Sequence, residues 1–181
     1  DEAEAGMSRE ELTVLVRQGM TTGTIHPDES RMMEGVISFE KLVAYDIMIP
    51  PSRMVWIDQD AAHDELWPTL LHSAQEVFPV CHGSRDNLVG VVSIKDLCGQ
   101  LAAGGPLDFA RTVQPPLLIP ETQKARLLLE TFRKTGQRAA FVLDEFGSVV
   151  GMVTLIDLIE TIIGDVPSRE EQLNRPVTRR A

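Results

Sequence analysis

An internal repeat is the feature that most constrains the fold of this chain. Residues 87–97, NLVGVVSIKDL, align without gaps on residues 148–158, SVVGMVTLIDL, at an offset of 61 positions. The same offset relates Leu66 to Leu127 and Val80 to Phe141. A unit of about 60 residues buries too little surface to be stable alone, so we expect the two copies to pack on each other about a pseudo-twofold axis.

Each copy predicts the same order of secondary structure. Short runs rich in Val and Ile alternate with stretches of helical periodicity, and Pro and Gly separate them, which indicates strand, helix, strand, strand, helix. The expected elements are 54–57, 63–75, 77–81, 88–93 and 94–101 in the first copy, and 117–119, 122–135, 139–143, 149–154 and 155–163 in the second. The predicted fold class is therefore α/β, or more strictly α+β, with the β-α-β-β-α unit occurring twice.

Two helices are expected ahead of the repeats. Ser8 and Glu11 form an S-x-x-E capping box before a helix over 9–18, and Pro27 suits the first position of a second helix that begins near His26. The predicted organisation is a linker and helical lead over 1–43, a first repeat over 44–104, a second over 105–166, and a mobile tail over 167–181.

Composition excludes several classes of function. The 181 residues carry a formal net charge of −10, which opposes a nucleic-acid binder, because phosphate backbones are held by clustered Lys and Arg. No apolar run approaches the roughly 18 residues of a membrane span. Neither the two cysteines nor the four histidines have the spacing of a metal site, and the paired acids Asp144 and Glu145 have no nucleophile beside them. We therefore expect no metal site and no catalytic residues.

The motif G-x-x-[ST]-x-x-D occurs once in each copy. It places Ser93 and Asp96 in the first copy, and Thr154 and Asp157 in the second, at the junction between a strand and a helix. The start of a helix offers free N–H groups that suit a phosphate, and an aspartate beside it can accept two hydroxyl hydrogens, as from a ribose diol. The alternative reading is simple helix capping.

The repeat resembles a tandem pair of CBS domains. Residues 46–50, DIMIP, together with 78–80, FPV, and 86–90, DNLVG, and then 142–147, VLDEFG, look like the CBS pair of the haemolysin-like, CorC-type magnesium and cobalt efflux family. The helical lead also resembles the linker of that family, so the resemblance covers about residues 8–167.

The resemblance implies two clefts between the copies. One would contain Thr154, Asp157 and Arg138, with Ile47, Met48, Val77 and Phe78 around the base; the other would contain Ser93 and Asp96, with Val113 and Ala139. Val77 and Pro51 stand where the family usually has arginine, so the first copy has lost two cations. Since arginine binds phosphate strongly, we predict that the Asp157 cleft binds and that the Asp96 cleft binds poorly.

The resemblance also implies a function. In similar proteins the CBS pair lies at the cytoplasmic face of the membrane, between a transmembrane domain and a small C-terminal domain. The expected ligand is an adenine nucleotide, AMP or ATP, with or without Mg²⁺, and the expected assembly is a homodimer formed through the CBS pairs. The competing interpretation is a structural dimerisation module whose clefts bind nothing.

Overall fold

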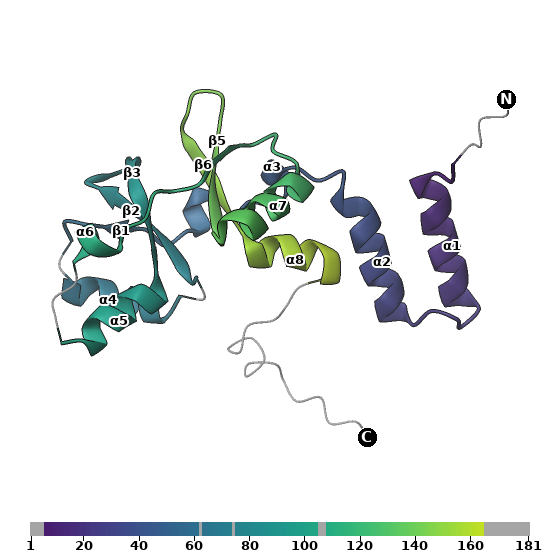
Figure 1. The fold of residues 1–181 in the computed structure, drawn as a ribbon, viewed down its shortest axis with the longest axis horizontal. Coiled ribbons are helices and arrows are strands. Elements are labelled where there is room, and N and C mark those ends of the chain that lie inside the picture. The colour runs from purple at the N-terminus through teal and green to yellow at the C-terminus, as the bar shows by residue number, and fades with distance from the viewer. Residues whose placement is uncertain (1–5, 62, 74, 105–107, 165–181) are drawn as a thin grey trace, which may run out of the picture.

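The two repeats fold into two similar halves, each with a three-stranded sheet and helices packed on it (Figure 1). The computed structural model describes residues 6–61, 63–73, 75–104 and 108–164. In chain order the elements are α1 (Arg9–Thr21), α2 (Pro27–Phe39), α3 (Ala44–Ile47), the 3-10 helix η1 (Pro51–Arg53), β1 (Ile57–Asp58), α4 (His63–Leu71), β2 (Val77–His82), β3 (Ser84–Ser93), α5 (Ile94–Ala102), α6 (Phe109–Thr112), β4 (Leu118–Pro120), α7 (Ala125–Thr135), β5 (Ala139–Leu143), β6 (Val149–Thr154) and α8 (Leu155–Ile163).

The two sheets have the same topology, which confirms the repeated unit. In the first half β1 runs parallel to β2 and β2 antiparallel to β3; in the second half β4, β5 and β6 repeat this arrangement. The predicted bounds of β5, β6 and α8 are confirmed. The tail predicted to be mobile lies outside the described residues.

The predicted strand over 54–57 is wrong, because only Ile57 and Asp58 join the sheet. The backbone of Val55 forms hydrogen bonds with the side chain of Gln75 instead of with a neighbouring strand. The Val55 N–H donates to Gln75 Oε1 at 3.0 Å, and the Val55 carbonyl accepts from Gln75 Nε2 at 3.1 Å. The helix predicted over 63–75 ends at Leu71, which frees Gln75 to make these bonds.

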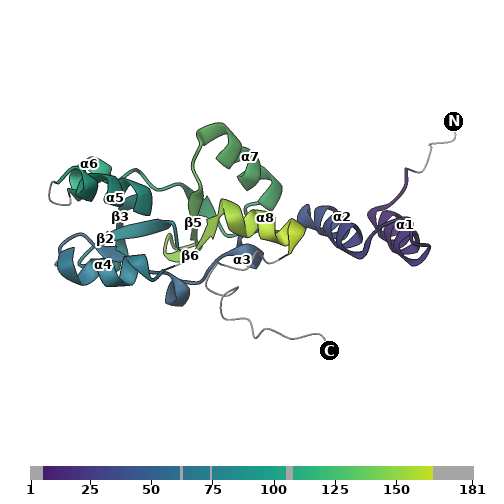
Figure 2. The same cartoon turned by 90° about the horizontal axis from the view of Figure 1, so that it is seen from below.

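The N-terminal helices belong with the second half. Phe39 and Ala44 are buried in the same cluster as Leu128 and Leu158. The segment after α2 lies along the start of α7, where the Ala44 N–H donates to the Gln123 carbonyl at 2.8 Å and the Ala125 N–H to the Leu42 carbonyl at 3.0 Å. Figures 1 and 2 accordingly show α2 beside the end of α8, away from the first half.

The two halves are joined because the segment leading into each sheet forms a β-bridge with a strand of the other half. Ile49, on the way into the first sheet, forms an antiparallel bridge with Met152 of β6, and Gln114, on the way into the second sheet, bridges to Val91 of β3. Between these bridges lies a buried seam that contains Met54, Ala139, Phe141 and Met152. The halves are therefore tied together by backbone hydrogen bonds as well as by apolar packing.

The glycine of each motif allows these bridges. A Cβ on Gly90 would lie 2.3 Å from Val113 Cγ1 and 2.5 Å from the Gln114 carbonyl oxygen, and a Cβ on Gly151 would lie 2.6 Å from Met48 Sδ. Both glycines have ordinary backbone conformations. Glycine is therefore needed at these positions for the close approach of the other segment, not for a left-handed turn.

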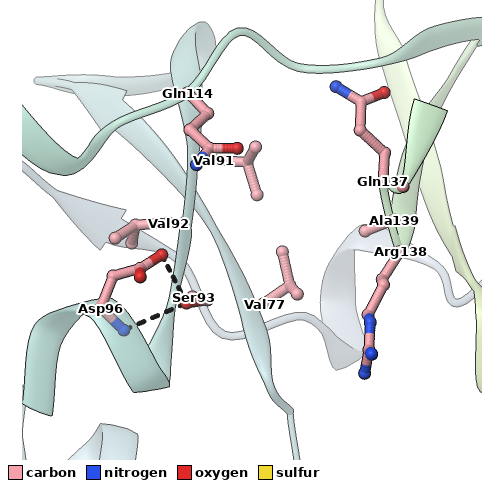
Figure 3. A pocket seen from close by; sticks show the side chains of 10 residues that line it. Val77, Val91, Val92, Ser93, Asp96, Gln114, Gln137, Arg138 and Ala139 are labelled. Carbon is pink, nitrogen blue, oxygen red and sulfur yellow. Dashed lines mark hydrogen bonds between the residues drawn. The ribbon is translucent and has the colours of Figure 1, made fainter. Parts of the chain in front are cut away.

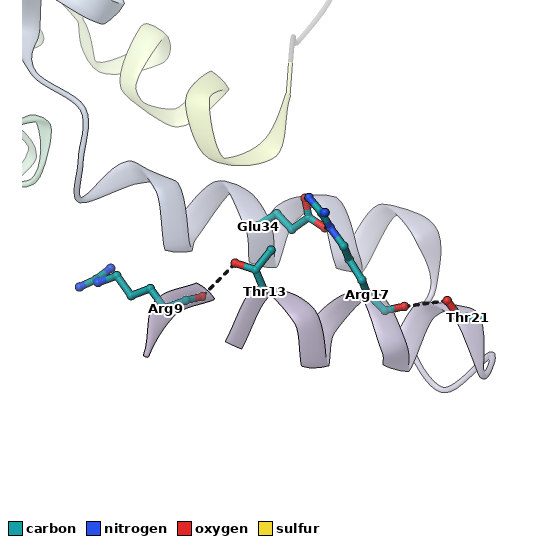
Figure 4. Close-up of polar contacts among 5 residues, drawn as sticks. All are labelled: Arg9, Thr13, Arg17, Thr21 and Glu34. Atoms are coloured by element: carbon teal, nitrogen blue, oxygen red, sulfur yellow. Dashed lines mark hydrogen bonds and ion pairs between the residues drawn. The ribbon is translucent and has the colours of Figure 1, made fainter. Parts of the chain in front are cut away.

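Helix α1 packs along α2, and exposed ion pairs join it to α2 and to the residues that follow α2. No residue of α1 is buried, and the ion pairs join Arg9 to Glu40, Glu10 to Lys41, and Arg17 to Glu34. The last pair is drawn in Figure 4, where Arg17 reaches across to Glu34 on α2. The hydrogen bond from Arg17 holds the pKa of Glu34 below its usual value.

Candidate functional site

The motif of the second half forms a capping box at the start of α8. Thr154 ends β6, and Asp157 lies in the first turn of the helix. Asp157 Oδ2 accepts the Thr154 N–H at 2.6 Å and the Thr154 hydroxyl at 2.7 Å, while Thr154 Oγ1 accepts the Asp157 N–H at 3.2 Å. The capping role is therefore real, but it uses only one oxygen of the carboxylate and leaves Oδ1 for a hydroxyl donor.

The environment of Asp157 is half-buried. Burial raises the pKa of this carboxyl above its ordinary value, while the two hydrogen bonds from Thr154 and the charge of Arg53 act in the opposite direction. Desolvation of the charge dominates. A partly desolvated carboxylate is common in binding sites, although buried groups with a purely structural role also have perturbed pKa values.

Arg53 is the residue of this site that the sequence did not predict. It ends η1, two positions after Pro51, the position directly after the M-x-P segment where the resemblance led us to expect an arginine. Its charge acts on Asp157 from more than a hundred positions away in the chain. The sequence could have pointed to this residue only through its position, because Arg53 lies two residues after Pro51, where an arginine was expected.

The motif of the first half forms a more open site at the start of α5. Asp96 Oδ2 accepts the Ser93 hydroxyl at 2.6 Å, and Ser93 Oγ accepts the Asp96 N–H at 3.1 Å. Asp96 is exposed, whereas Asp157 is half-buried. The two copies of the motif thus have the same local geometry and differ in solvation.

A cavity of about 180 Å³ lies between Asp96 and the second half. Figure 3 shows Ser93 and Asp96 on one side and Gln137, Arg138 and Ala139 on the other. Apolar side chains, including Val77 and Val91, complete the wall. Pockets that enclose a drug-sized ligand are usually about 300 Å³ or larger, so this cavity suits one part of a nucleotide, with the remainder outside it.

Two predicted residues lie in a different place from the one expected. Arg138 and Val77 were assigned to the Asp157 cleft, but both line the cavity of Ser93 and Asp96. Val77 pairs with Ser93 in the sheet, which fixes it at that end of β2. The carbonyl of Arg138 accepts the Leu155 N–H at 2.9 Å beside α8, while its side chain lines the cavity of the other motif. Ala139 lines this cavity as predicted.

The remaining predicted residues are mostly packed in the interior. Phe78 is fully buried in the core of the first half, so it is not exposed to a ligand. Ile47 and Met48 pack against the core of the second half, and Met48 lies against Gly151. Val113 lies against Gly90. These residues shape the walls between the halves, and the polar groups of the motifs remain the candidates for ligand contact.

Within the described ranges no helix is both long and apolar enough to span a bilayer. In the same residues, no group of three His, Cys, Asp or Glu side chains is arranged to hold a metal ion.

Comparison with known proteins identifies the class first. The family model of the CBS domain matches residues 108–164, which include the second half. The structure is similar to a solved CBS domain of the bacterial CNNM/CorC family Mg²⁺ transporter, with a TM-score of 0.75 and 32% identity, covering 90% of this chain and 99% of the other. The protein is thus a tandem CBS-domain pair, as the repeat and the motifs predicted.

The chain belongs to the CNNM/CorC family. It is 36% identical to the magnesium and cobalt efflux protein CorC of Pasteurella multocida over 160 residues, which cover 88% of this chain and 53% of that protein. The chain therefore spans about half the length of this curated relative. CBS domains of this family are non-enzymatic, as the sequence predicted.

A second solved structure carries a ligand. It is a CBS domain of the bacterial CNNM/CorC family Mg²⁺ transporter in complex with ATP, with 33% identity and a TM-score of 0.66, covering 77% of this chain and all of the other.

Proposed function

We propose that this chain is the regulatory part of a membrane transport protein and that it binds an adenine nucleotide between its two halves. The observation that carries the proposal is the hydrogen-bonded pair of a half-buried carboxylate and a hydroxyl, Asp157 and Thr154, at the start of α8, with the 3-10 helix that contains Arg53 packed on β6 beside them. Asp157 Oδ1 would accept the ribose hydroxyls, and the helix N-terminus with Arg53 would hold the phosphates. The ATP complex of a similar CBS domain supports an adenine nucleotide as the ligand.

We propose the Asp157 cleft as the tighter of two nucleotide sites. Hydrogen bonds to a charged group strengthen as solvent is excluded, and Asp157 is less exposed than Asp96. The cavity of Ser93, Asp96 and Arg138 is the second site, because it too combines a hydroxyl, a carboxylate and a cation. Mg²⁺ would arrive on the phosphates of the nucleotide, where it offsets part of the net charge of −10.

Calorimetric titration with AMP and with ATP, each with and without Mg²⁺, tests both sites through matched variants. Arg53→Ala and Asp157→Ala are expected to weaken binding about tenfold or more, because a hydrogen bond to a charged group contributes about 1.5–3 kcal/mol. Arg138→Ala and Asp96→Ala are the matched pair in the other cleft. If only the second pair weakens binding, the Asp96 cavity is the main site. If the unmodified chain binds neither nucleotide, the structural dimerisation module is the better interpretation.

We also propose that the whole protein moves magnesium or cobalt ions and that this part lies at the cytoplasmic face of the membrane. The relative from Pasteurella multocida is named a magnesium and cobalt efflux protein, which supports these ions as the transported species. The similar CBS domain comes from a Mg²⁺ transporter, which supports a location at the membrane. The transmembrane domain and the small C-terminal domain are then partners of this chain. Ion efflux from cells that carry the full-length protein, compared with cells that carry the Asp157→Ala variant, tests this assignment.

The second copy in a homodimer is proposed to lie against α8. Ile156, Ile159 and Ile163 are exposed at helical spacing along α8, whereas the first repeat has Lys95, Cys98 and Ala102 at the corresponding positions. This uncharged stripe lets two copies with a net charge of −10 each approach without facing like charges. Light scattering after size exclusion should show a dimer that Ile159→Lys converts to a monomer, with Cys98→Ser as the control. A monomer in the unmodified chain would contradict this arrangement.

A further inference from the structure

Helix α8 has a different partner at each end. Its N-terminus is the capping box of Thr154 and Asp157, and its C-terminal turn contains Ile162, which lies against α2. At 1.5 Å per residue, these two ends are about 12 Å apart along one short helix. Anything that changes the position of one end is therefore transmitted to the other, because a helix of this length moves as a unit.

The contact between α2 and α8 is a close approach of backbones. A Cβ on Gly35 would lie 2.3 Å from the Ile162 carbonyl oxygen and 2.9 Å from Ile162 Cα. Backbone atoms cannot rotate away as a side chain can, so α2 follows a displacement of Ile162 directly. Phe39 reinforces this contact from the last turn of α2, because it is buried in the same cluster as Leu158 of α8.

In the described residues, the end of α5 has a different partner. Gln100 of α5 donates from Nε2 to the Asp108 carbonyl at 3.0 Å and accepts the Asp108 N–H at Oε1 at 2.8 Å, so this end faces the segment that leads into the second half and not α2. The Ser93–Asp96 capping geometry is otherwise similar to that at the start of α8. The two nucleotide clefts are therefore not equivalent with respect to the N-terminal helices, although their motifs match.

We propose that α8 couples the Thr154–Asp157 site to the docking of α2. A ligand at this site, but not one at Ser93–Asp96, then strengthens the attachment of α1 and α2 to the second half. The identity of the ligand in this inference rests on the proposed nucleotide function. The path of the coupling rests on the contact between Ile162 of α8 and Gly35 of α2. Coupling between two sites is reciprocal: docking of α2 raises the affinity of the site for nucleotide by the same factor by which nucleotide favours docking.

The first test uses Gly35→Ala, with Gly99→Ala as the control. Both changes place alanine in a helix, but only the first puts a methyl group against a backbone carbonyl. We expect Gly35→Ala to weaken ATP binding about fivefold or more, the lower end of common coupling factors, and Gly99→Ala to leave it unchanged within about twofold. ATP should also slow amide exchange in α2 of the unmodified chain. Equal affinity for the two variants, with unchanged exchange in α2, would overturn the coupling.

The second test needs no ligand. Thr154→Ala removes the cap of α8, and Ser93→Ala removes the matching cap of α5. Loss of a cap weakens a helix start by about 1 kcal/mol, so amide exchange around Gly35 should become about two- to fivefold faster in Thr154→Ala and stay unchanged in Ser93→Ala. If both variants leave α2 unchanged, α8 does not couple the two ends. If ATP does not bind to the unmodified chain, the proposed function fails, and this exchange experiment alone decides the coupling.

Discussion

Replacing the motif glycines by alanine should have unequal effects, although the two positions are equivalent in the repeat. At Gly90 the new methyl group meets the Gln114 carbonyl oxygen at 2.5 Å as well as Val113 Cγ1 at 2.3 Å. At Gly151 it meets the flexible side chain of Met48, with Sδ at 2.6 Å, and the Ile49 carbonyl oxygen only at 3.0 Å. Neither glycine has a positive φ. The difference between the two variants therefore comes from what the methyl group meets and not from backbone strain.

The structure gives the size of the difference. To relieve the clash in Gly90→Ala, the segment at Gln114 must move away from Val91, which endangers two backbone hydrogen bonds of 2.9 Å. Each contributes about 1 kcal/mol, and overpacking adds about 1–3 kcal/mol, so we expect a loss of about 3–5 kcal/mol. In Gly151→Ala the Met48 side chain can rotate, and the Ile49 carbonyl, at 3.0 Å, needs to shift only slightly, so the expected loss is about 1 kcal/mol.

Thermal unfolding of the two variants, with Gly99→Ala as a control, measures these losses. In a chain of this size 1 kcal/mol corresponds to about 2–4 °C in Tm, so Gly90→Ala should unfold about 6–20 °C below the unmodified protein and Gly151→Ala about 2–4 °C below it. Gly99→Ala should be neutral or slightly stabilising, because alanine favours a helix and the site is open. Equal losses at Gly90 and Gly151 would refute the reasoning.

Three further predictions concern other parts of the molecule. Burial raises the pKa of Asp157, so the folded state holds this proton more tightly than the unfolded state, and this residue's contribution to stability falls as pH rises from about 3.8 through the raised pKa. In urea titrations across that range, Asp157→Asn should remove this decline, and an unchanged pH profile would contradict the prediction. Phe39→Ala should cost about 3–5 kcal/mol, because Phe39 fills the core of the second half, and a loss below 1 kcal/mol in thermal unfolding would show that it does not. Glu34→Gln removes the negative charge and one of the two oxygens that accept from Arg17, so amide exchange in α1 should become faster while the Tm of the chain stays unchanged; slower or unaltered exchange would be evidence against the role of this ion pair.

Much of the fold could be predicted from the sequence, because it depends on local patterns. The second repeat has clear alternation and a clear motif, and its last two strands and last helix begin and end where predicted. The strand predicted over 54–57 failed for a non-local reason. Gln75 satisfies the backbone of Val55, so a segment with suitable composition does not pair with β2.

The candidate site was less predictable, because it is assembled across the two halves. The pairing of Thr154 with Asp157 follows from a three-residue spacing in one helix, and the structure has it as expected. Which arginine belongs to which cleft does not follow from spacing. Arg138 lies next to α8 in the backbone and yet lines the cavity of Asp96, and Arg53 acts on Asp157 although it belongs to the other repeat.

The second half has a core made from both ends of the described chain, and this affects how the protein is synthesised and folds. Phe39 and Ala44 leave the ribosome early, but their packing partner Leu158 is made only near the end of the second repeat. Contacts so distant in sequence slow folding, because the intervening chain must close a large loop before they form. During translation α2 therefore has an unpaired apolar face until α8 appears. Because the first half has its own core and is complete earlier, we expect its strands and helices to form first and to become fully stable only when the second half packs on them.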